Sequence, residues 1–278
     1  MTLVATREIM DAALATGTGV GAFNVVHLET AQALVAGAES AERGVILQIS
    51  QNCALYHGAL EPIALGTIAI ARAASVPVAV HLDHADDEAL VDEAIRLGFG
   101  SVMFDGSTLD YDANVEATQR VANRARARGV YVEAELGQIS GKAGAHAPGV
   151  RTDPGEARDF VEATDVDALA VAVGSSHAMT ERSATLDLAL ISRLHEQVPV
   201  PLVLHGSSGV ADEQLRAAIR AGMTKINVST HFNGQFTRAI REYLAEYPLA
   251  VDSRSYLAHG REAVAVEAAR LLELFATP

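Results

Sequence analysis

Short apolar runs alternate with longer amphipathic stretches along almost the whole chain. The runs are rich in Val, Ile, Leu and Ala, as in the buried strands of a parallel sheet, and the longer stretches have the apolar spacing of helices. This pattern predicts strands at 20–25, 44–50, 76–81, 101–104, 130–135, 169–173, 201–204 and 225–228. Helices are predicted at 6–16, 28–42, 61–74, 87–97, 111–128, 154–163, 186–197, 211–221, 231–247 and 255–275.

Strands that alternate regularly with helices, without a change of composition between them, predict the α/β class and a (β/α)8 TIM barrel. Two helices are predicted after the last strand, so this barrel has extra C-terminal helices. We expect residues 1–278 to form a single domain. The alternative, a doubly wound sheet, opens on a glycine-rich turn that follows its first strand. Here Gly17-Thr-Gly-Val-Gly21 precedes a strand instead, which favours the barrel.

Polar side chains gather where the predicted strands end. The apolar run that begins at Val76 ends in His81, Asp83 and His84. Strict alternation along a strand places His81 and Asp83 on one face and His84 on the other. Two later runs end in His177 and His205. Because the active sites of these barrels lie at the carboxyl ends of the strands, three imidazoles there predict a metal site.

Other strand ends add to this ring of polar residues. Acids and hydroxyls lie at the ends of the fourth and fifth strands, and glycines and small polar residues lie at the ends of the seventh and eighth. They are Asp105, Ser107, Glu133, Glu135, Gly206, Gly209, Asn227 and Thr230. The last two loops of a barrel often hold a phosphate, which backbone N–H groups can bind.

Charge and composition narrow the class of partner. Lys and Arg total 21 against 35 acids, and the net charge of −14 argues against nucleic acid and anionic membranes as partners. No apolar run reaches the roughly 18 residues of a membrane span. A single cysteine, Cys53, excludes an internal disulfide, and the first residues do not resemble a signal peptide. We therefore expect a cytoplasmic enzyme that acts on a small molecule.

These motifs together resemble the class II, zinc-dependent ketose-phosphate aldolases, which include fructose-bisphosphate and tagatose-bisphosphate aldolases. The resemblance extends from Ala22 to Ala263. Its most specific parts are His81-Leu-Asp-His84, Ser101-Val-Met-Phe-Asp-Gly-Ser107, Val132-Glu-Ala-Glu-Leu-Gly137, Leu204-His-Gly-Ser-Ser-Gly209 and Lys225-Ile-Asn-Val228. The resemblance implies reversible cleavage of a ketose phosphate to dihydroxyacetone phosphate and an aldehyde, through a zinc-bound enediolate.

The resemblance also assigns roles to individual residues. It makes His84, His177 and His205 the Zn²⁺ ligands, with Glu135 and Asp105 at or near the metal, and Asp83 the catalytic acid and base. The residues that it assigns to the sugar phosphate substrate are Asn24, Ser50, Gly206, Ser208, Asn227, Ser229 and Thr230. A monovalent cation, Na⁺ or K⁺, near the phosphate and a homodimer or homotetramer formed through the C-terminal helices are further expectations.

Several positions depart from the family pattern. Ala143 stands where the loop after the fifth strand usually carries the Glu that moves a proton. His146 is a candidate substitute for this loop base, and Asp153 and Glu156 are alternatives. Ser229 replaces the Asp that is usual in fructose-bisphosphate aldolases, and the basic residue expected near Asn233 is missing. We therefore expect a specificity for the distal end of the sugar that differs from that of the standard bisphosphate enzymes.

Two other functions remain open at the level of the sequence. The first is a non-catalytic or weakly active companion subunit of an aldolase complex, which keeps the barrel but lacks the loop base. The retained histidines and Asp83 argue against it. The second is a zinc hydrolase on the same barrel, which would need a His-x-His pair after the first strand. That strand ends in Phe23-Asn24-Val25, so this function is disfavoured.

Overall fold

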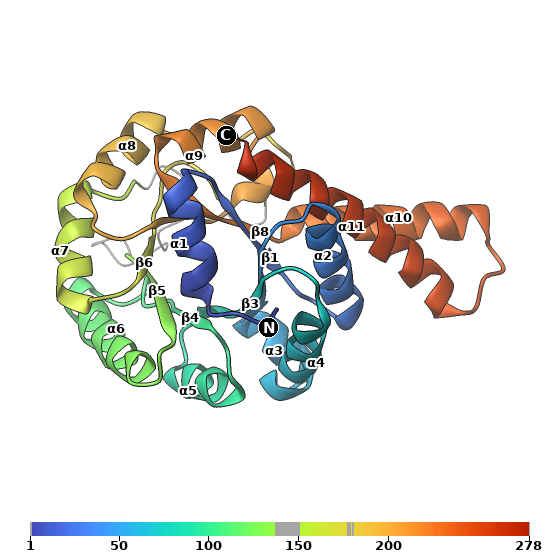
Figure 1. The fold of residues 1–278 in the computed structure, drawn as a ribbon, viewed down its shortest axis with the longest axis horizontal. Helices are drawn as coiled ribbons and strands as arrows, with labels where there is room; N and C mark the ends of the chain where they lie inside the picture. Colours follow the sequence, from blue (N-terminus) through green and yellow to red (C-terminus); the bar gives the residue numbers. More distant parts are fainter. Residues whose placement is uncertain (1, 137–150, 177–178, 180, 278) are drawn as a thin grey trace.

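The computed structural model is a closed barrel of eight parallel strands (Figure 1). It describes residues 2–136, 151–176, 179 and 181–277. The strands follow one another around the barrel in sequence order, and β8 closes the ring by pairing with β1. The predicted TIM barrel is therefore confirmed.

Most elements lie where the pattern of apolar residues predicts them. The strands are β1 (Val20–Asn24), β2 (Val45–Ser50), β3 (Val78–Ala85), β4 (Ser101–Phe104), β5 (Tyr131–Glu135), β6 (Ala168–Ala170), β7 (Leu202–Leu204) and β8 (Met223–Val228). The helices are α1 (Thr6–Thr16), α2 (Leu28–Ser40), α3 (Gln51–His57), α4 (Leu60–Ala73), α5 (Glu88–Leu97), α6 (Tyr111–Arg126), α7 (Pro154–Thr164), α8 (Leu188–Gln197), α9 (Asp212–Ala221), α10 (Thr230–Glu246) and α11 (Ser253–Ala276).

A few boundaries differ from the predictions for physical reasons. β3 begins only after Pro77, which has no N–H for the ladder, and it continues through the polar residues to Ala85. α3 and a short 3₁₀ turn at Ser207–Gly209 were not predicted. α3 follows β2 without an intervening turn, because the Ser50 hydroxyl oxygen accepts a hydrogen bond from the N–H of Cys53 and caps the helix.

The apolar core has two layers. Inside the barrel, Ile9 and Met10 of α1 pack with inward-facing strand residues such as Ile46 and Met103. Because these α1 residues join the interior cluster, α1 covers the amino-terminal end of the barrel (Figure 1). The second, larger layer lies between the strands and the surrounding helices. Polar side chains gather at the opposite end of the barrel, where the strands end.

α10 and α11 form a long antiparallel hairpin. The second half of α11 lies against α2, and the other end of the hairpin extends well beyond the barrel (Figure 1). Gly37 of α2 allows this close approach, because a Cβ there would lie 2.6 Å from the backbone oxygen of Ala265. The hairpin is thus anchored to the barrel at one end only.

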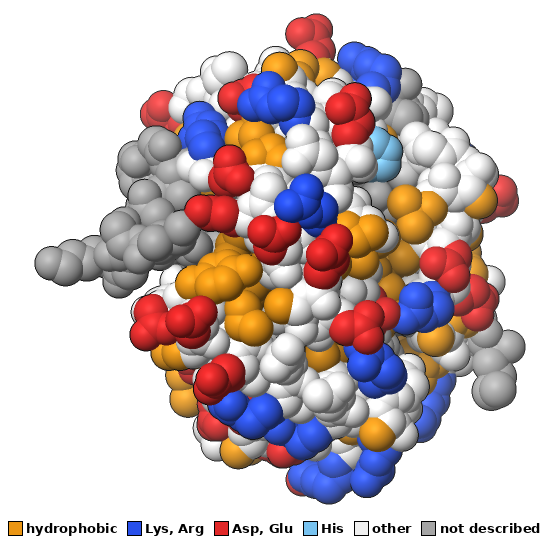
Figure 2. Space-filling model, turned by 90° about the vertical axis from the view of Figure 1, so that its left-hand side faces the viewer, with side chains coloured by type: hydrophobic (Ala, Val, Ile, Leu, Met, Phe, Trp, Pro, Cys, Tyr) orange, Lys and Arg blue, Asp and Glu red, His pale blue; other side chains and the backbone are white. Residues whose placement is uncertain are grey.

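The surface carries both signs of charge. On the face formed by the α6 to α8 side of the barrel, basic and acidic side chains are interspersed (Figure 2). Opposite charges also pair between neighbouring elements, as Arg120 of α6 does with Glu88 of α5 and Arg126 of α6 with Asp165. Among the described residues no single helix is long and apolar enough to cross a membrane. Only α3 and α4 together reach that length and composition, and they are bent by 110°.

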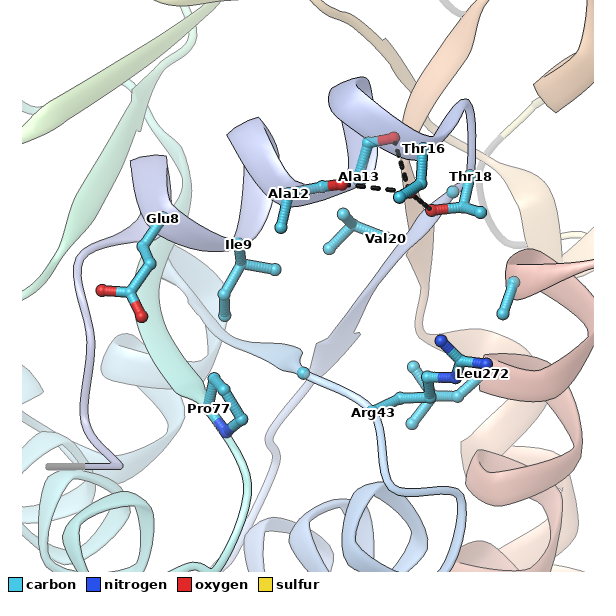
Figure 3. Close-up of a pocket in the computed structure, with 13 residues that line it drawn as sticks. Glu8, Ile9, Ala12, Ala13, Thr16, Thr18, Val20, Arg43, Pro77 and Leu272 are labelled. Carbon is cyan, nitrogen blue, oxygen red and sulfur yellow. Dashed lines mark hydrogen bonds between the residues drawn. The ribbon is translucent and has the colours of Figure 1, made fainter.

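A cleft of about 310 Å³ lies at the amino-terminal end of the barrel, between α1 and the end of α11 (Figure 3). Its lining is largely apolar, with Ile9, Val20 and Leu272, and Arg43 lies at its edge. Val20 starts β1 and Pro77, another lining residue, precedes β3, so the cleft is at the far end of the barrel from the strand termini.

Candidate active site

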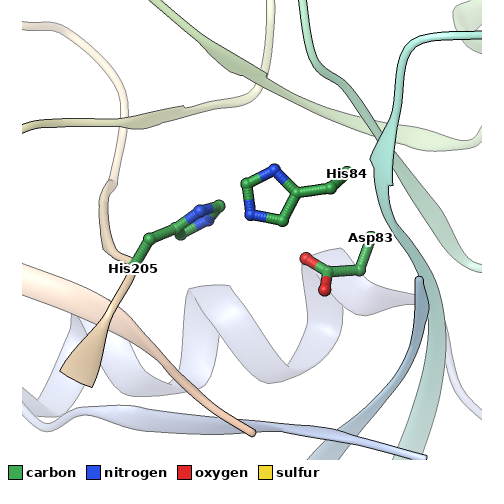
Figure 4. Close-up of side chains that lie close together, drawn as sticks. All are labelled: Asp83, His84 and His205. Atoms are coloured by element: carbon green, nitrogen blue, oxygen red, sulfur yellow. The ribbon is translucent and has the colours of Figure 1, made fainter. Parts of the chain in front are cut away.

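Three side chains from two strand ends meet at the carboxyl end of the barrel. Asp83 and His84 come from the end of β3 and His205 follows β7, and they point toward one another (Figure 4). One potential ligand atom from each lies within 4.8 Å of the others. The His84 and His205 rings are edge to face, with centroids 4.6 Å apart. Residues 121 positions apart thus form one cluster.

His84 does not lie on the outer face of β3, as strict alternation predicts. Its backbone has a φ of 48°, and the pairing of β3 with β4 shifts register between Leu82 and Ala85. A bulge of this kind redirects a side chain. The prediction that His84 and Asp83 point to opposite faces is therefore wrong, and both residues face the mouth of the barrel.

Carboxylates surround His84. Its Nδ1 lies 2.7 Å from Oδ2 of Asp105, and Glu135 completes a second group whose ligand atoms lie within 4.8 Å of one another. Burial opposes protonation of His84, but the charge of Asp83 and the hydrogen bond to Asp105 raise its pKa to about 10. The pKa of Asp105 is lowered against its burial by the same bond and by Ser107. This excess of negative charge favours a cation at His84.

A buried ion pair lies below the cluster. Lys225 Nζ donates to Oε2 of Glu133 at 2.7 Å, and His205 Nε2 is 3.0 Å from Oε1 of the same carboxylate. Nδ1 of His205 faces Oε2 of Glu135 at 3.6 Å. All four side chains are almost fully buried. His205 is therefore held between two carboxylates, one on each side of its ring.

A chain of amides orients Asp83. Gln48 Nε2 donates to Oδ1 of Asn24 at 3.1 Å, and Asn24 Nδ2 donates to Oδ2 of Asp83 at 2.7 Å. The other Asp83 oxygen, Oδ1, is buried and has no hydrogen-bond partner among the described residues. One oxygen is thus fixed and the other is available for a proton or a ligand.

Small polar residues surround the beginning of α10. Gly206 has a φ of 67°, and a Cβ there would lie 2.6 Å from the backbone of Ser176, so only glycine fits. The Ser208 hydroxyl oxygen accepts from the N–H of His231 in the first turn of α10. Asn227 Oδ1 is buried without a hydrogen-bond partner among the described residues. Ser229 precedes α10 and Thr230 begins it. This arrangement suits an anion at a helix amino terminus.

The sequence of the chain matches the profile of the family described as fructose-bisphosphate aldolase class-II over residues 4–277. The chain belongs to this family. It is 39% identical to the fructose-bisphosphate aldolase of Thermus caldophilus, with 98% of each chain covered. It is 38% identical to that of Geobacillus stearothermophilus, covering 95% of this chain and 93% of the relative. The expectation of an aldolase, a carbon–carbon lyase, is confirmed.

Solved structures of aldolases share the fold. The YdjI aldolase from Escherichia coli K12 superposes with a TM-score of 0.87 at 29% identity, over 98% of this chain and 97% of that one. A putative fructose-1,6-biphosphate aldolase from Coccidioides immitis gives a TM-score of 0.86 at 26% identity, over 98% and 96%. The likeness therefore covers nearly the whole barrel and its C-terminal hairpin.

The donors of this class II aldolase fit a divalent metal. Two imidazoles and a carboxylate converge in the first group, and one imidazole and two carboxylates in the second. Asp83 Oδ1 is a buried acceptor without a partner among the described residues, which a metal or a proton would satisfy. His and carboxylate donors of this kind bind zinc. The residues present thus fit the metal that the family resemblance implies.

Several predicted site residues have other local roles or lie outside the described chain. Ser50 caps α3, although it also pairs in register with Asp83. Asp153 caps α7 by accepting from two backbone N–H groups, so its carboxylate is engaged and is poorly suited to act as a loop base. His177 and the candidate loop base His146 lie outside the described residues.

Some residues of the site were not among the predicted site residues. Gln48 and Lys225 lie within apolar strand runs, where the pattern predicts core residues. Glu133 is predicted only to be a polar residue at a strand end. Lys225 and Asn227 are two positions apart on β8, as Glu133 and Glu135 are on β5, so each pair shares the inner face. That spacing is the signal that could have placed them in the site.

Proposed function

We propose that this aldolase is zinc-dependent and reversibly cleaves a ketose phosphate into dihydroxyacetone phosphate and an aldehyde. The convergence of Asp83, His84 and His205 at the mouth of the barrel carries this proposal. Family membership supports the aldol reaction, and the donor set supports a metal-assisted form of it. His177 would be the third imidazole. Bound zinc would supply Lewis-acid polarisation of a substrate oxygen.

Asp83 is the group placed to move a proton. Asn24 holds its Oδ2, so Oδ1 takes the C4 hydroxyl proton during cleavage and returns a proton to the aldehyde oxygen in the reverse direction. Because the side chain is almost fully buried, this transfer takes place with little competition from water. Gln48 fixes the orientation of the Asn24 amide and thereby the position of the acid.

The phosphate of the dihydroxyacetone half binds near the start of α10 in this proposal. Gly206 and Ser208 approach from the loop after β7, and Asn227, Ser229 and Thr230 approach from β8 and α10. The backbone N–H groups of a helix amino terminus favour an anion even in a protein with a net charge of −14. A monovalent cation, Na⁺ or K⁺, beside this phosphate belongs to the same proposal.

The distal end of the substrate is proposed to differ from the usual phosphate. Ser229 carries no charge where fructose-bisphosphate aldolases usually have Asp, and Asn233 lies in α10 without the basic residue expected near it. A ketose 1-phosphate or a deoxy sugar acid phosphate would fit such a site. Asn24 and Ser50 are the residues proposed to contact this half of the sugar.

We also propose that the protein is a cytoplasmic homodimer or homotetramer joined through the α10–α11 hairpin. The hairpin extends beyond the barrel, and its tip exposes Leu249 and Val251 to 92% and 94%. Tyr243 and Tyr247 line the same cleft as these residues, with their rings tilted by 39° and the centroids 4.8 Å apart. An exposed apolar tip on a projecting arm is typical of an interface. Light scattering coupled to size-exclusion chromatography measures the oligomeric state. A monomer in solution would contradict the proposed homo-oligomer.

Metal analysis combined with a cleavage assay tests the function. The protein, with and without a chelator, is given fructose 1,6-bisphosphate, tagatose 1,6-bisphosphate and fructose 1-phosphate, and released triose phosphate is followed by a coupled reaction. We expect stoichiometric zinc and chelator-sensitive cleavage that favours the monophosphate. Faster cleavage of a bisphosphate would refute the altered specificity alone. Absence of zinc from the folded protein would refute the metal site. Zinc without cleavage of any of the three sugars would point to an unusual substrate or to a lost loop base.

A further inference from the structure

Glu133 accepts or faces donors from three different strands inside the barrel. Lys225 Nζ of β8 lies 2.7 Å from Oε2, and His205 Nε2 lies 3.0 Å from Oε1. His81 Nε2 of β3 faces Oε2 at 3.9 Å. These side chains are at most 1% exposed. An acid in the interior of a barrel needs such compensation, because an uncompensated buried charge is costly.

The hydrogen bonds around Glu133 determine which nitrogen of His205 carries a proton. An ionised carboxylate only accepts, so Nε2 of His205 carries a proton, and a ring that ligates a metal through its other nitrogen carries no second proton. Nδ1 is then the nitrogen with a lone pair, and it lies on the side of the ring that faces Glu135. Because His205 forms a cluster with Asp83 and His84, this lone pair is the one that a metal would use.

A second series of hydrogen bonds runs from the closed end of the barrel to His81, which faces Glu133. Thr6 Oγ1 of α1 donates to Ser101 Oγ at 2.6 Å, and Ser101 Oγ lies 2.8 Å from His81 Nδ1. With its single proton, Ser101 then donates to Nδ1, which leaves the proton of His81 on Nε2, toward Glu133. His81 Nε2 thus faces the carboxylate across 3.9 Å, which is beyond hydrogen-bond distance but places a second donor beside it.

We propose that Glu133 is a positioning residue for the metal centre, which accepts the Nε2–H of His205 and presents Nδ1 to the metal. Lys225 compensates its charge and fixes its orientation. This inference rests on the proposed metal site and assigns a role to residues that act through His205. Acceptors of this kind set the tautomer of a ligating histidine and typically change metal affinity about 10- to 100-fold.

Two double variants separate this role from the stability of the ion pair. Glu133→Gln with Lys225→Met removes both charges but keeps an amide oxygen that can accept from His205. Glu133→Leu with Lys225→Met removes both charges and the acceptor. Neutral pairs of similar volume generally replace a buried ion pair without loss of folding. Thr164→Ala is the control for the loss of a buried hydrogen bond away from the site, because the Thr164 hydroxyl donates to the Phe160 oxygen within α7.

Metal affinity is the readout. Each protein is depleted of metal, titrated with Co²⁺ while its visible absorption is followed, and then competed for Zn²⁺ against a chelating indicator. We expect the leucine variant to bind about 10- to 100-fold more weakly than the glutamine variant, with an altered Co²⁺ spectrum. Thr164→Ala should bind as the unmodified protein does. Equal affinities and spectra in the two double variants would overturn the positioning role.

The unmodified protein provides a second test that does not depend on the folding of any variant. Nitrogen NMR of the zinc-loaded protein, labelled in histidine, reports which ring nitrogen carries the proton. A proton on Nε2 of His205 and metal on Nδ1 supports the inference, and the reverse assignment overturns it. If the unmodified protein binds neither Co²⁺ nor Zn²⁺, the proposed metal site itself fails, which is a different result from equal binding by the variants.

Discussion

His84 and Asp105 form a hydrogen-bonded pair at the mouth of the barrel, with Nδ1 of His84 2.7 Å from Oδ2 of Asp105. Asp105 is itself held by the hydroxyl and the N–H of Ser107, at 2.6 and 3.1 Å. An anchored carboxylate of this kind fixes the orientation of an imidazole and directs its other nitrogen away from the carboxylate. The pair thus prepares His84 Nε2 for a ligand.

Replacement of Asp105 tests this preparation. Asp105→Asn keeps the size of the side chain but removes the charge, so we expect Zn²⁺ affinity to fall about 10- to 100-fold and cleavage to fall with it. Competition with a chelating indicator measures the affinity. Asp110→Asn, which changes an exposed helix cap at the start of α6, is the control. Unchanged zinc affinity in Asp105→Asn would show that the pair does not orient a metal ligand.

Variants of Asp83 and Asn24 test the proposed proton transfer. Asp83→Asn retains the shape of the site but cannot exchange a proton, so we expect kcat to fall about 10²- to 10⁴-fold. Asn24→Ala removes the 2.7 Å bond that holds Asp83 and should have a smaller effect on kcat, in the same direction. The coupled cleavage assay measures both. Full activity of Asp83→Asn would remove Asp83 from the reaction.

The barrel and the polar ring at its mouth follow from local patterns in the sequence. Buried strands have continuous apolar runs, and an even spacing of polar residues correctly places His81 and Asp83 on one inner face. The inward turn of His84 could not be predicted, because it depends on a backbone bulge that no side-chain pattern records. The sequence thus predicts which face of a regular strand a residue occupies, but it does not predict a local bulge in the backbone.

Long-range polar pairs were equally hard to predict. Glu133 and Lys225 are 92 positions apart and meet only because the barrel closes. Lys225 also sits in an apolar strand, where a lysine suggests a solvated edge before the partner is known. Other functional contacts depend on the same closure, among them the contact of His84 with His205. The sequence predicts which strand ends carry chemistry, and the closed fold determines which side chains touch.

The pair of His231 and Glu267 predicts how stability depends on pH. Burial alone would raise the pKa of Glu267, but hydrogen bonds from Arg270 and His231 lower it to about 2. Because the folded pKa is below the ordinary value of 4.5, the contribution of Glu267 is complete above about pH 4.5. It is lost as the pH falls from there toward 2.

Glu267→Gln should therefore destabilise the protein at pH 7 by about 1–2 kcal/mol, a moderate value because Arg270 is partly exposed. The difference from the unmodified protein should shrink as the pH falls below about 4.5. Urea unfolding at a series of pH values measures it. Glu273→Gln, elsewhere on α11, is the control and should show neither effect. A difference that stays constant down to pH 3 would contradict the assignment.

Two glycines in helices test how the hairpin is anchored. A Cβ at Gly37 would lie 2.6 Å from both the Ala265 oxygen and the Ala268 Cβ, so Gly37→Ala must push α11 away from α2. We expect a loss of about 1–3 kcal/mol, typical of overpacking. Gly234 of α10 has nothing within 4 Å of its Cβ position, so Gly234→Ala should stabilise by up to about 1 kcal/mol through helix propensity. Thermal unfolding compares the two variants. If both variants raise the midpoint temperature of unfolding, the close contact between α2 and α11 does not limit the packing of the hairpin.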